Sequence, residues 1–118
     1  AIGDGTLTGH YQKIADKLYW FNIYFLAAAN TTFGTSNWSF GNLPFTVKST
    51  SPALQVVSAV LVESGVASHT GTARLNPGGT AVSLVVGGET GTRHATSSQP
   101  FNWGENDSLA IEGIVATD

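Results

Sequence analysis

The three histidines His10, His69 and His94 are the first residues of this 118-residue chain whose side chains could do chemistry. Histidine is the commonest metal ligand, but metal-binding histidines usually recur at short spacings such as HxH, HxxxH or HExxH. These three lie far apart in the sequence, so only the fold could gather them around a zinc ion. We therefore interpret each as a surface or subunit-contact residue, and we expect neither a metal site nor a cofactor.

The acidic residues are the second group with catalytic potential. Two carboxylates hydrolyse a glycosidic bond when one acts as an acid and the other as a base or nucleophile. Most of the eight Asp and Glu residues fall in expected turns or at strand ends, and only Glu63 and Glu112 fall within expected strands. No GxSxG elbow, P-loop or strand-coupled GxGxxG is present. The sequence therefore predicts a protein that is not an enzyme, with a cell-wall glycan hydrolase using Glu63 and Glu112 as the least favoured alternative.

The turn Gly104-Glu-Asn-Asp107 places several oxygen ligands within four residues, which a calcium-binding loop also does. Its spacing departs from that of an EF-hand loop, and a turn of this composition forms without an ion. We expect a turn here and no bound metal.

Tryptophan is the third residue type of interest, because its ring presents a large apolar surface with one polar edge. Trp38 begins a short expected strand beside the 29–36 loop, and Trp103 precedes an expected turn. Each ring could stack on a sugar or close one end of the core, and the second interpretation is favoured. Among loop residues we name Arg93, His94 and Trp103 as candidate ligand contacts, although a purely structural role is the favoured interpretation of each.

The elements that must position these residues are strands. The stretch from Lys17 to Leu26, KLYWFNIYFL, is rich in aromatic and β-branched residues and has no Gly or Pro. Both of its pleat faces are apolar, whereas a sheet that faces water on one side alternates apolar with polar residues. Since one face must cover the core, the other requires a second layer or another subunit. We name Trp20, Tyr24 and Leu26 as a candidate subunit interface.

Turn signals recur about every ten residues, and no amphipathic helix is visible, so the chain is expected to be all-β. Eight strands of this length predict a two-layer antiparallel β-sandwich, a jelly roll, formed by one domain over residues 1–118. Ala15-Asp16-Lys17 and Asn76-Pro-Gly-Gly79 are expected hairpin turns, and Phe45 to Leu54 an expected crossover. The strands we expect are Thr6–Ile14, Lys17–Ala28, Asn37–Gly41, Gln55–Glu63, Gly71–Asn76, Thr80–Val86, Thr96–Asn102 and Asp107–Ala116.

Charged residues make up only 11% of the chain, and Gly, Ser, Thr and Asn fill the polar positions. Such a neutral, hydroxyl-rich surface suits an extracellular or virion protein and permits close subunit packing, since few charges need partners. The net charge is −3 and no basic stripe exists, so nucleic acid is not an expected partner. No run of 18 apolar residues exists, so no membrane span is expected.

Three stretches resemble a pattern that recurs in bacteriophage structural proteins: Gly9-His-Tyr-Gln-Lys-Ile-Ala-Asp-Lys-Leu18, Trp38-Ser-Phe-Gly-Asn-Leu-Pro-Phe45 and Pro100-Phe-Asn-Trp-Gly-Glu-Asn-Asp-Ser-Leu109. Gly71-Thr-Ala-Arg-Leu-Asn76 is also similar to it. The pattern belongs to minor tail proteins, tail fibres and head fibres, especially of phages of actinobacteria. Ala15-Asp16 departs from the commoner Gly-Asn, and Asn42 is an insertion in the Gly-Leu-Pro motif, but both still suit a turn.

The resemblance implies a homotrimeric jelly-roll module of a virion, with other virion proteins as partners. Tail forms imply attachment to a host-surface glycan, and head forms imply capsid decoration, which remains the alternative. Ala1 is interpreted as the cut edge of a longer polypeptide, of which residues 1–118 would be the C-terminal part, rather than as the residue that follows a removed Met. The matching residues are structural, so the resemblance assigns no binding residue.

Overall fold

A computed structural model describes residues 1–86 and 93–118, in which every regular element is a β-strand and every strand pair is antiparallel. The prediction of an all-β fold is thereby confirmed. In the described part of the chain, no helix is long and apolar enough to cross a membrane. The strands are β1 (Thr6–Ala15), β2 (Leu18–Leu26), β3 (Ser39–Phe40), β4 (Gln55–Glu63), β5 (Ala67–Leu75), β6 (Val82–Val86), β7 (Arg93–His94) and β8 (Ser108–Ala116).

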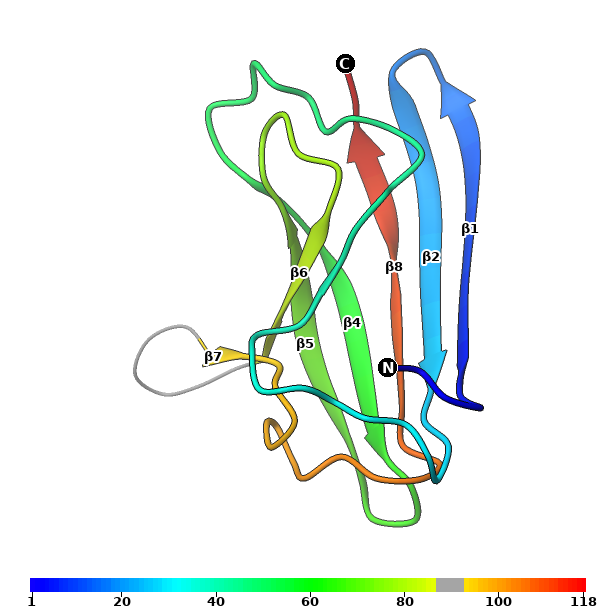
Figure 1. The fold of residues 1–118 in the computed structure, drawn as a ribbon. Coiled ribbons are helices and arrows are strands. Elements are labelled where there is room, and N and C mark those ends of the chain that lie inside the picture. Colours follow the sequence, from blue (N-terminus) through cyan, green and yellow to red (C-terminus); the bar gives the residue numbers. More distant parts are fainter. Residues whose placement is uncertain (87–92) are drawn as a thin grey trace.

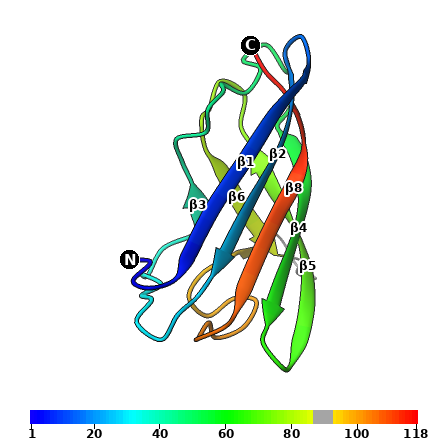
Figure 2. The ribbon, with the colours of Figure 1, turned by 90° about the vertical axis from the view of Figure 1, so that its right-hand side faces the viewer.

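The strands form one hydrogen-bonded sheet in the order β1-β2-β8-β4-β5-β6-β3, with β7 paired to β6. The sheet curls, so that β1, β2, β8, β4 and β5 run side by side while β6 and β3 lie behind them (Figure 2). The structure therefore shows one curled antiparallel sheet that is continuous from β5 to β6, and the two-layer jelly roll stays a prediction. The strands β1 and β3 are the two ends of this path.

Two hairpin turns lie where the sequence predicts them. Asp16 and Lys17 join β1 to β2, and Lys17 adopts a left-handed conformation with φ 56°. The turn Asn76–Gly79 joins β5 to β6, with Gly78 at φ 76°, a conformation that glycine adopts without steric cost. The strand predicted over Gln55–Glu63 has the same bounds as β4.

Other predicted elements differ from the structure. The expected strand over 96–102 is wrong: Thr96 and Gln99 form only an isolated bridge, because their backbone groups bond each other across a tight turn. The expected strand over 37–41 shortens to β3, and β5 begins earlier than expected because Gly65, at φ 74°, closes a turn directly after β4. The strand β7 was not expected.

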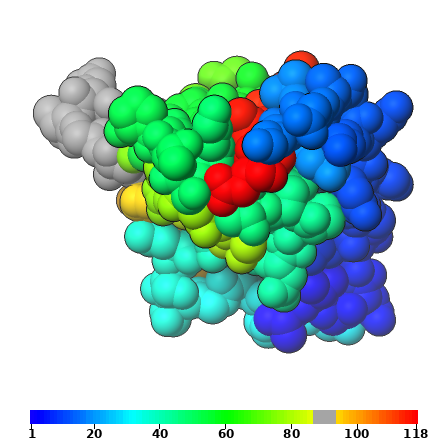
Figure 3. All heavy atoms as spheres, turned by 90° about the horizontal axis from the view of Figure 1, so that it is seen from above, coloured from blue at the N-terminus to red at the C-terminus, as the bar shows by residue number. Residues whose placement is uncertain are grey.

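The expected crossover passes over one end of the sheet. Phe45 is buried and stacks on Tyr19 with ring centroids 5.3 Å apart, and the fully buried Val47 bridges to Thr117. Beyond it, Ser49 donates its backbone N–H to Asp118 at 2.8 Å. Figure 3, viewed from above, shows the red C-terminal residues enclosed between this green segment and the blue β1–β2 hairpin. In Figure 1 the chain begins near the opposite end of the sheet.

The core fills the concave side of the curled sheet. Along β2 the side chains of Phe21, Ile23 and Phe25 are buried, whereas Trp20 and Asn22 are half-buried and Tyr24 is exposed. This alternation follows from the two-residue period of a strand. The inward-facing residues of β2 lie beside those of β8, since Ile23 pairs with Ile111 and Phe25 with Leu109.

Candidate binding surfaces

We call the convex side of strands β1, β2, β8, β4 and β5 the outer face (Figure 2). Strand alternation places Trp20, Tyr24 and Leu26 on this face together. The predicted candidate interface residues therefore share one surface, with Tyr24 at 40% exposure and the other two half-buried.

Apolar side chains from three strands lie on the outer face. Tyr24 pairs with Ala110 and Ala110 with Val60, so these side chains form a row across β2, β8 and β4. On the other side of the Asn22–Glu112 pair, Trp20 pairs with Ile114. Val60 is 42% exposed and Ile114 is 55% exposed, which is unusual for β-branched residues within a sheet.

A polar row crosses the outer face between these two apolar rows. The register pairs His10 with Asn22, Asn22 with Glu112, Glu112 with Ser58 and Ser58 with Thr72, one residue from each of five strands. His10 Nδ1 lies 3.2 Å from Asn22 Oδ1. The Trp20 Nε1–H donates to Glu112 Oε1 at 3.1 Å, which fixes the indole ring against the sheet. The row is thus an ordered strip of hydroxyl, amide and carboxylate groups.

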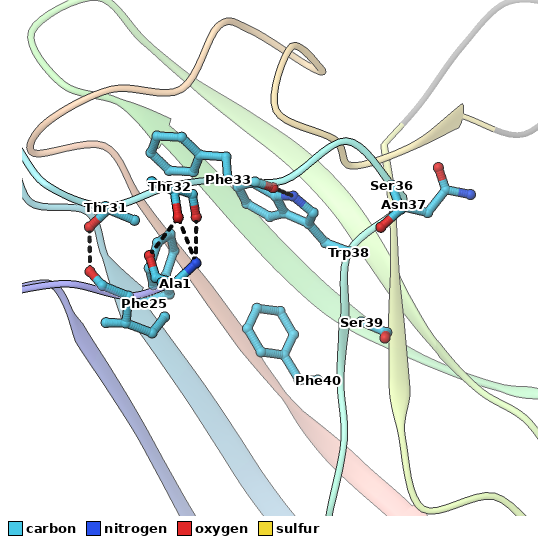
Figure 4. Close-up of a pocket in the computed structure, with 11 residues that line it drawn as sticks. Ala1, Phe25, Thr31, Thr32, Phe33, Ser36, Asn37, Trp38, Ser39 and Phe40 are labelled. Carbon is cyan, nitrogen blue, oxygen red and sulfur yellow. Dashed lines mark hydrogen bonds between the residues drawn. The ribbon is translucent and has the colours of Figure 1, made fainter.

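A second surface is an aromatic pocket of about 370 Å³ near the N-terminal residues. Phe33 stacks on Trp38 with ring centroids 5.9 Å apart and an interplanar angle of 16°. The Trp38 indole N–H donates to Phe33 O at 3.1 Å, so the two residues hold each other (Figure 4). Thr32, Ser36 and Asn37 are exposed around the same pocket and supply hydroxyl and amide groups. The pocket is therefore lined by aromatic rings that also pack on one another, with hydroxyl and amide groups at its edge.

The candidate ligand contacts named from sequence do not gather at either surface. Trp103 is only 7% exposed and packs on Trp38 with ring centroids 4.7 Å apart. Its indole N–H donates to Gln99 O at 3.2 Å. It therefore closes one end of the core and offers little ring surface to a ligand. His94 pairs with Val85 and is half-buried, while the side chain of Arg93 lies outside the described residues.

The candidate hydrolytic pair is not assembled. Glu112 lies opposite Ser58 on the outer face, whereas Glu63 lies five residues further along β4 and, by strand alternation, on the other side. Five residues of strand span roughly 16 Å. Glycosidases need their two carboxyl groups about 5 to 10 Å apart. The prediction that Glu63 and Glu112 could act together is therefore wrong.

The remaining titratable residues form no metal site in the part of the chain that the structure describes. His10 lies on the outer face, and His69 packs against Phe101 with ring centroids 5.3 Å apart. In the Gly104–Asp107 turn, both carboxylate oxygens of Asp107 accept backbone N–H groups. Both oxygens of Asp107 are therefore already engaged in hydrogen bonds within the chain.

Comparison of the chain with models of known protein families, with characterised proteins and with solved structures finds no match.

Proposed function

We propose that this chain is a bacteriophage virion module that works by binding rather than by catalysis, displayed on a tail fibre or minor tail protein and taking part in attachment to the host surface. The observation that carries the proposal is the set of exposed apolar side chains on the outer face: Tyr24, Val60 and Ile114. A partner that covered them would remove this apolar surface from water, which is the main driving force of association. The resemblance to phage structural proteins supports the virion setting.

The partner in this proposal is a neighbouring copy of the chain. The module would be a jelly roll whose two layers are the two halves of the curled sheet, and three copies would close a ring through heterologous contacts. The low charge of the chain supports such packing, because desolvating a charged side chain without a partner is costly.

The variant Val60→Lys tests this assembly. An ammonium group in the centre of the outer face would be desolvated in the trimer, so we expect at least tenfold weaker association, equivalent to about 1.4 kcal/mol per contact. Light scattering at micromolar concentration would then report that the trimer formed by the unmodified chain is lost. Val66→Lys is the matched control, since Val66 is 73% exposed in the β4–β5 turn, away from this face. A monomeric unmodified chain would contradict the trimer.

The aromatic pocket is the surface that supports attachment to a glycan. Ring faces at Phe33 and Trp38 suit the apolar side of a sugar, and the exposed groups of Thr32, Ser36 and Asn37 suit its hydroxyls. No charged side chain from the described residues lines the pocket, but the Ala1 ammonium group does, and it donates to Thr32 O and Thr32 Oγ1.

Replacing Phe33 by alanine removes one wall of this pocket without touching the outer face. We expect about tenfold weaker binding of the chain to whole host bacteria, since the loss of one stacked ring costs about 1.4 kcal/mol. Binding is measured by sedimentation of labelled protein with cells, and Val66→Ala serves as the control. Equal binding by the Phe33 variant and the unmodified chain would exclude the pocket as the attachment site. Binding to capsids but not to bacteria would instead favour capsid decoration.

A further inference from the structure

The edge of β1 that faces away from β2 is the longest unpaired strand edge in the described part of the chain. All ten residues of β1 are exposed, and the strand pairs on one side only, with β2. Native proteins usually protect such an edge with proline, inward-pointing charges or a covering segment. Between Thr6 and Gln12, β1 has neither proline nor a formally charged residue. Its edge is therefore open to pairing with another strand.

The direction of the free backbone groups follows from the pairing with β2. His10 donates its backbone N–H to Asn22 Oδ1 at 3.1 Å, so its backbone groups are directed toward β2. In an antiparallel pair, successive residues direct their N–H and C=O groups to opposite sides. Leu7, Gly9 and Tyr11 therefore direct their backbone groups away from the sheet, where they can bond an added strand.

The sequence of β1 is symmetric in polarity about Gly9. Reading outward from Gly9, each direction gives a polar, an apolar and a polar residue, namely Thr8-Leu7-Thr6 and His10-Tyr11-Gln12. If two copies of β1 lie antiparallel with the two Gly9 residues opposite each other, Leu7 of each copy faces Tyr11 of the other. Thr8 then faces His10, Thr6 faces Gln12, and Lys13 faces Gly5, so no like charges meet. Cross-strand pairs of this kind stabilise a sheet by about 0.2 to 1 kcal/mol each.

The inner side of β1 has space for the incoming side chains. Leu7, Gly9 and Tyr11 line one wall of a groove of about 490 Å³, and the segment from Ser39 to Pro44 lines the other. An added Cβ at Gly41 would meet no atom within 4 Å, so the facing wall is open. Leu7 is 47% exposed and Tyr11 is 57% exposed. A second strand would cover both of these apolar side chains.

From this edge we propose that two copies of the chain associate through antiparallel pairing of their β1 strands, with a two-fold axis passing at Gly9. Such an interface is isologous, because the same strand contributes from both copies. It uses the strand edge and not the outer face, so it does not depend on the proposed trimer. If both contacts form, the β1 pairs join trimers to one another, and they close a hexamer if the two-fold axes cross the three-fold axis at right angles.

The first test compares Gly9→Pro with Gly9→Ala. Proline removes the outward-directed N–H at the axis but no β1–β2 hydrogen bond, and proline is tolerated on edge strands in this orientation. Alanine keeps the N–H, and its Cβ would meet only Asn22 O, at 3.5 Å. We expect at least tenfold weaker pairing in the proline variant and little change in the alanine variant, measured by analytical ultracentrifugation. Equal association of the two variants would overturn the proposal.

The second test does not depend on how the strand tolerates proline. The double variant Leu7→Lys with Tyr11→Lys places like charges opposite each other in the pair, and so does Leu7→Glu with Tyr11→Glu. We expect neither variant to pair alone and a one-to-one mixture of the two to pair again. Absence of pairing in the mixture would overturn the proposal. Adding Val60→Lys to every sample separates the two contacts, since loss of the outer-face trimer leaves a β1 dimer. An unmodified chain that forms a trimer and no larger assembly would overturn the β1 pairing and leave the proposed function standing.

Discussion

Replacing Gly113 by alanine is expected to lower the free energy of unfolding by about 3 kcal/mol, at the upper end of the cost of overpacking a core. Gly113 lies in β8 opposite Phe21, on the side of the sheet that faces the core. A Cβ at this position would meet Val57 Cγ1 and would lie 2.5 Å from Val57 Cβ. Val57 is buried on β4, so its branched side chain has little space into which it can move. The measurement is urea unfolding followed by tryptophan fluorescence.

Two controls separate this steric effect from a general effect of removing glycine. At Gly41 an added Cβ meets no atom within 4 Å, so Gly41→Ala is expected to change the free energy of unfolding by less than about 0.5 kcal/mol. Combining Gly113→Ala with Val57→Gly removes both side-chain atoms that clash, and the double variant should be more stable than the sum of the single effects predicts. If Gly113→Ala unfolds at the same urea concentration as the unmodified chain, β4 and β8 are not packed as closely as described.

Local sequence patterns were sufficient to predict most of the long strands. The uninterrupted aromatic and β-branched stretch of β2, and the matching alternation in β4 and β8, are properties of neighbouring residues alone. The turn at Asp16 and Lys17 could also be predicted from neighbouring residues alone. The failure over 96–102 has a physical reason, since Phe101 and Trp103 are as apolar as strand residues but are buried from a loop that folds over the core. Burial at that end of the sheet depends on tertiary packing.

The candidate site was predictable only in part. Trp20, Tyr24 and Leu26 could be placed on one face because they belong to one strand. The polar row could not be predicted, because Asn22 and Glu112 are 90 positions apart and meet only through the register of β2 with β8. A shift of one residue would send every side chain of a strand to the other face. The alternation of Glu112 with apolar neighbours was a signal that this residue faces outward, but it did not identify its partners.

Asp107→Ala is the second substitution expected to have a large effect, about 3 kcal/mol in the free energy of unfolding. The Asp107 carboxylate is 6% exposed, and it accepts the Ser64 N–H at 2.8 Å and the Gly104 N–H at 2.7 Å. It thereby ties the turn after β4 to the turn before β8. Each hydrogen bond to a charged group contributes about 1.5 to 3 kcal/mol, and the lower value applies here because Ser64 is exposed.

The matched variants separate the role of the carboxylate from that of the turn. Asp107→Asn keeps one acceptor oxygen and is expected to lose about half as much stability as Asp107→Ala. Glu105→Ala, an exposed position in the same turn, should unfold with the unmodified chain. Because both oxygens of Asp107 already accept backbone N–H groups, calcium should not raise the melting temperature. A calcium-dependent rise would mean that these oxygens bind an ion in solution, and an unchanged Asp107→Ala variant would mean that they do not hold the two turns together.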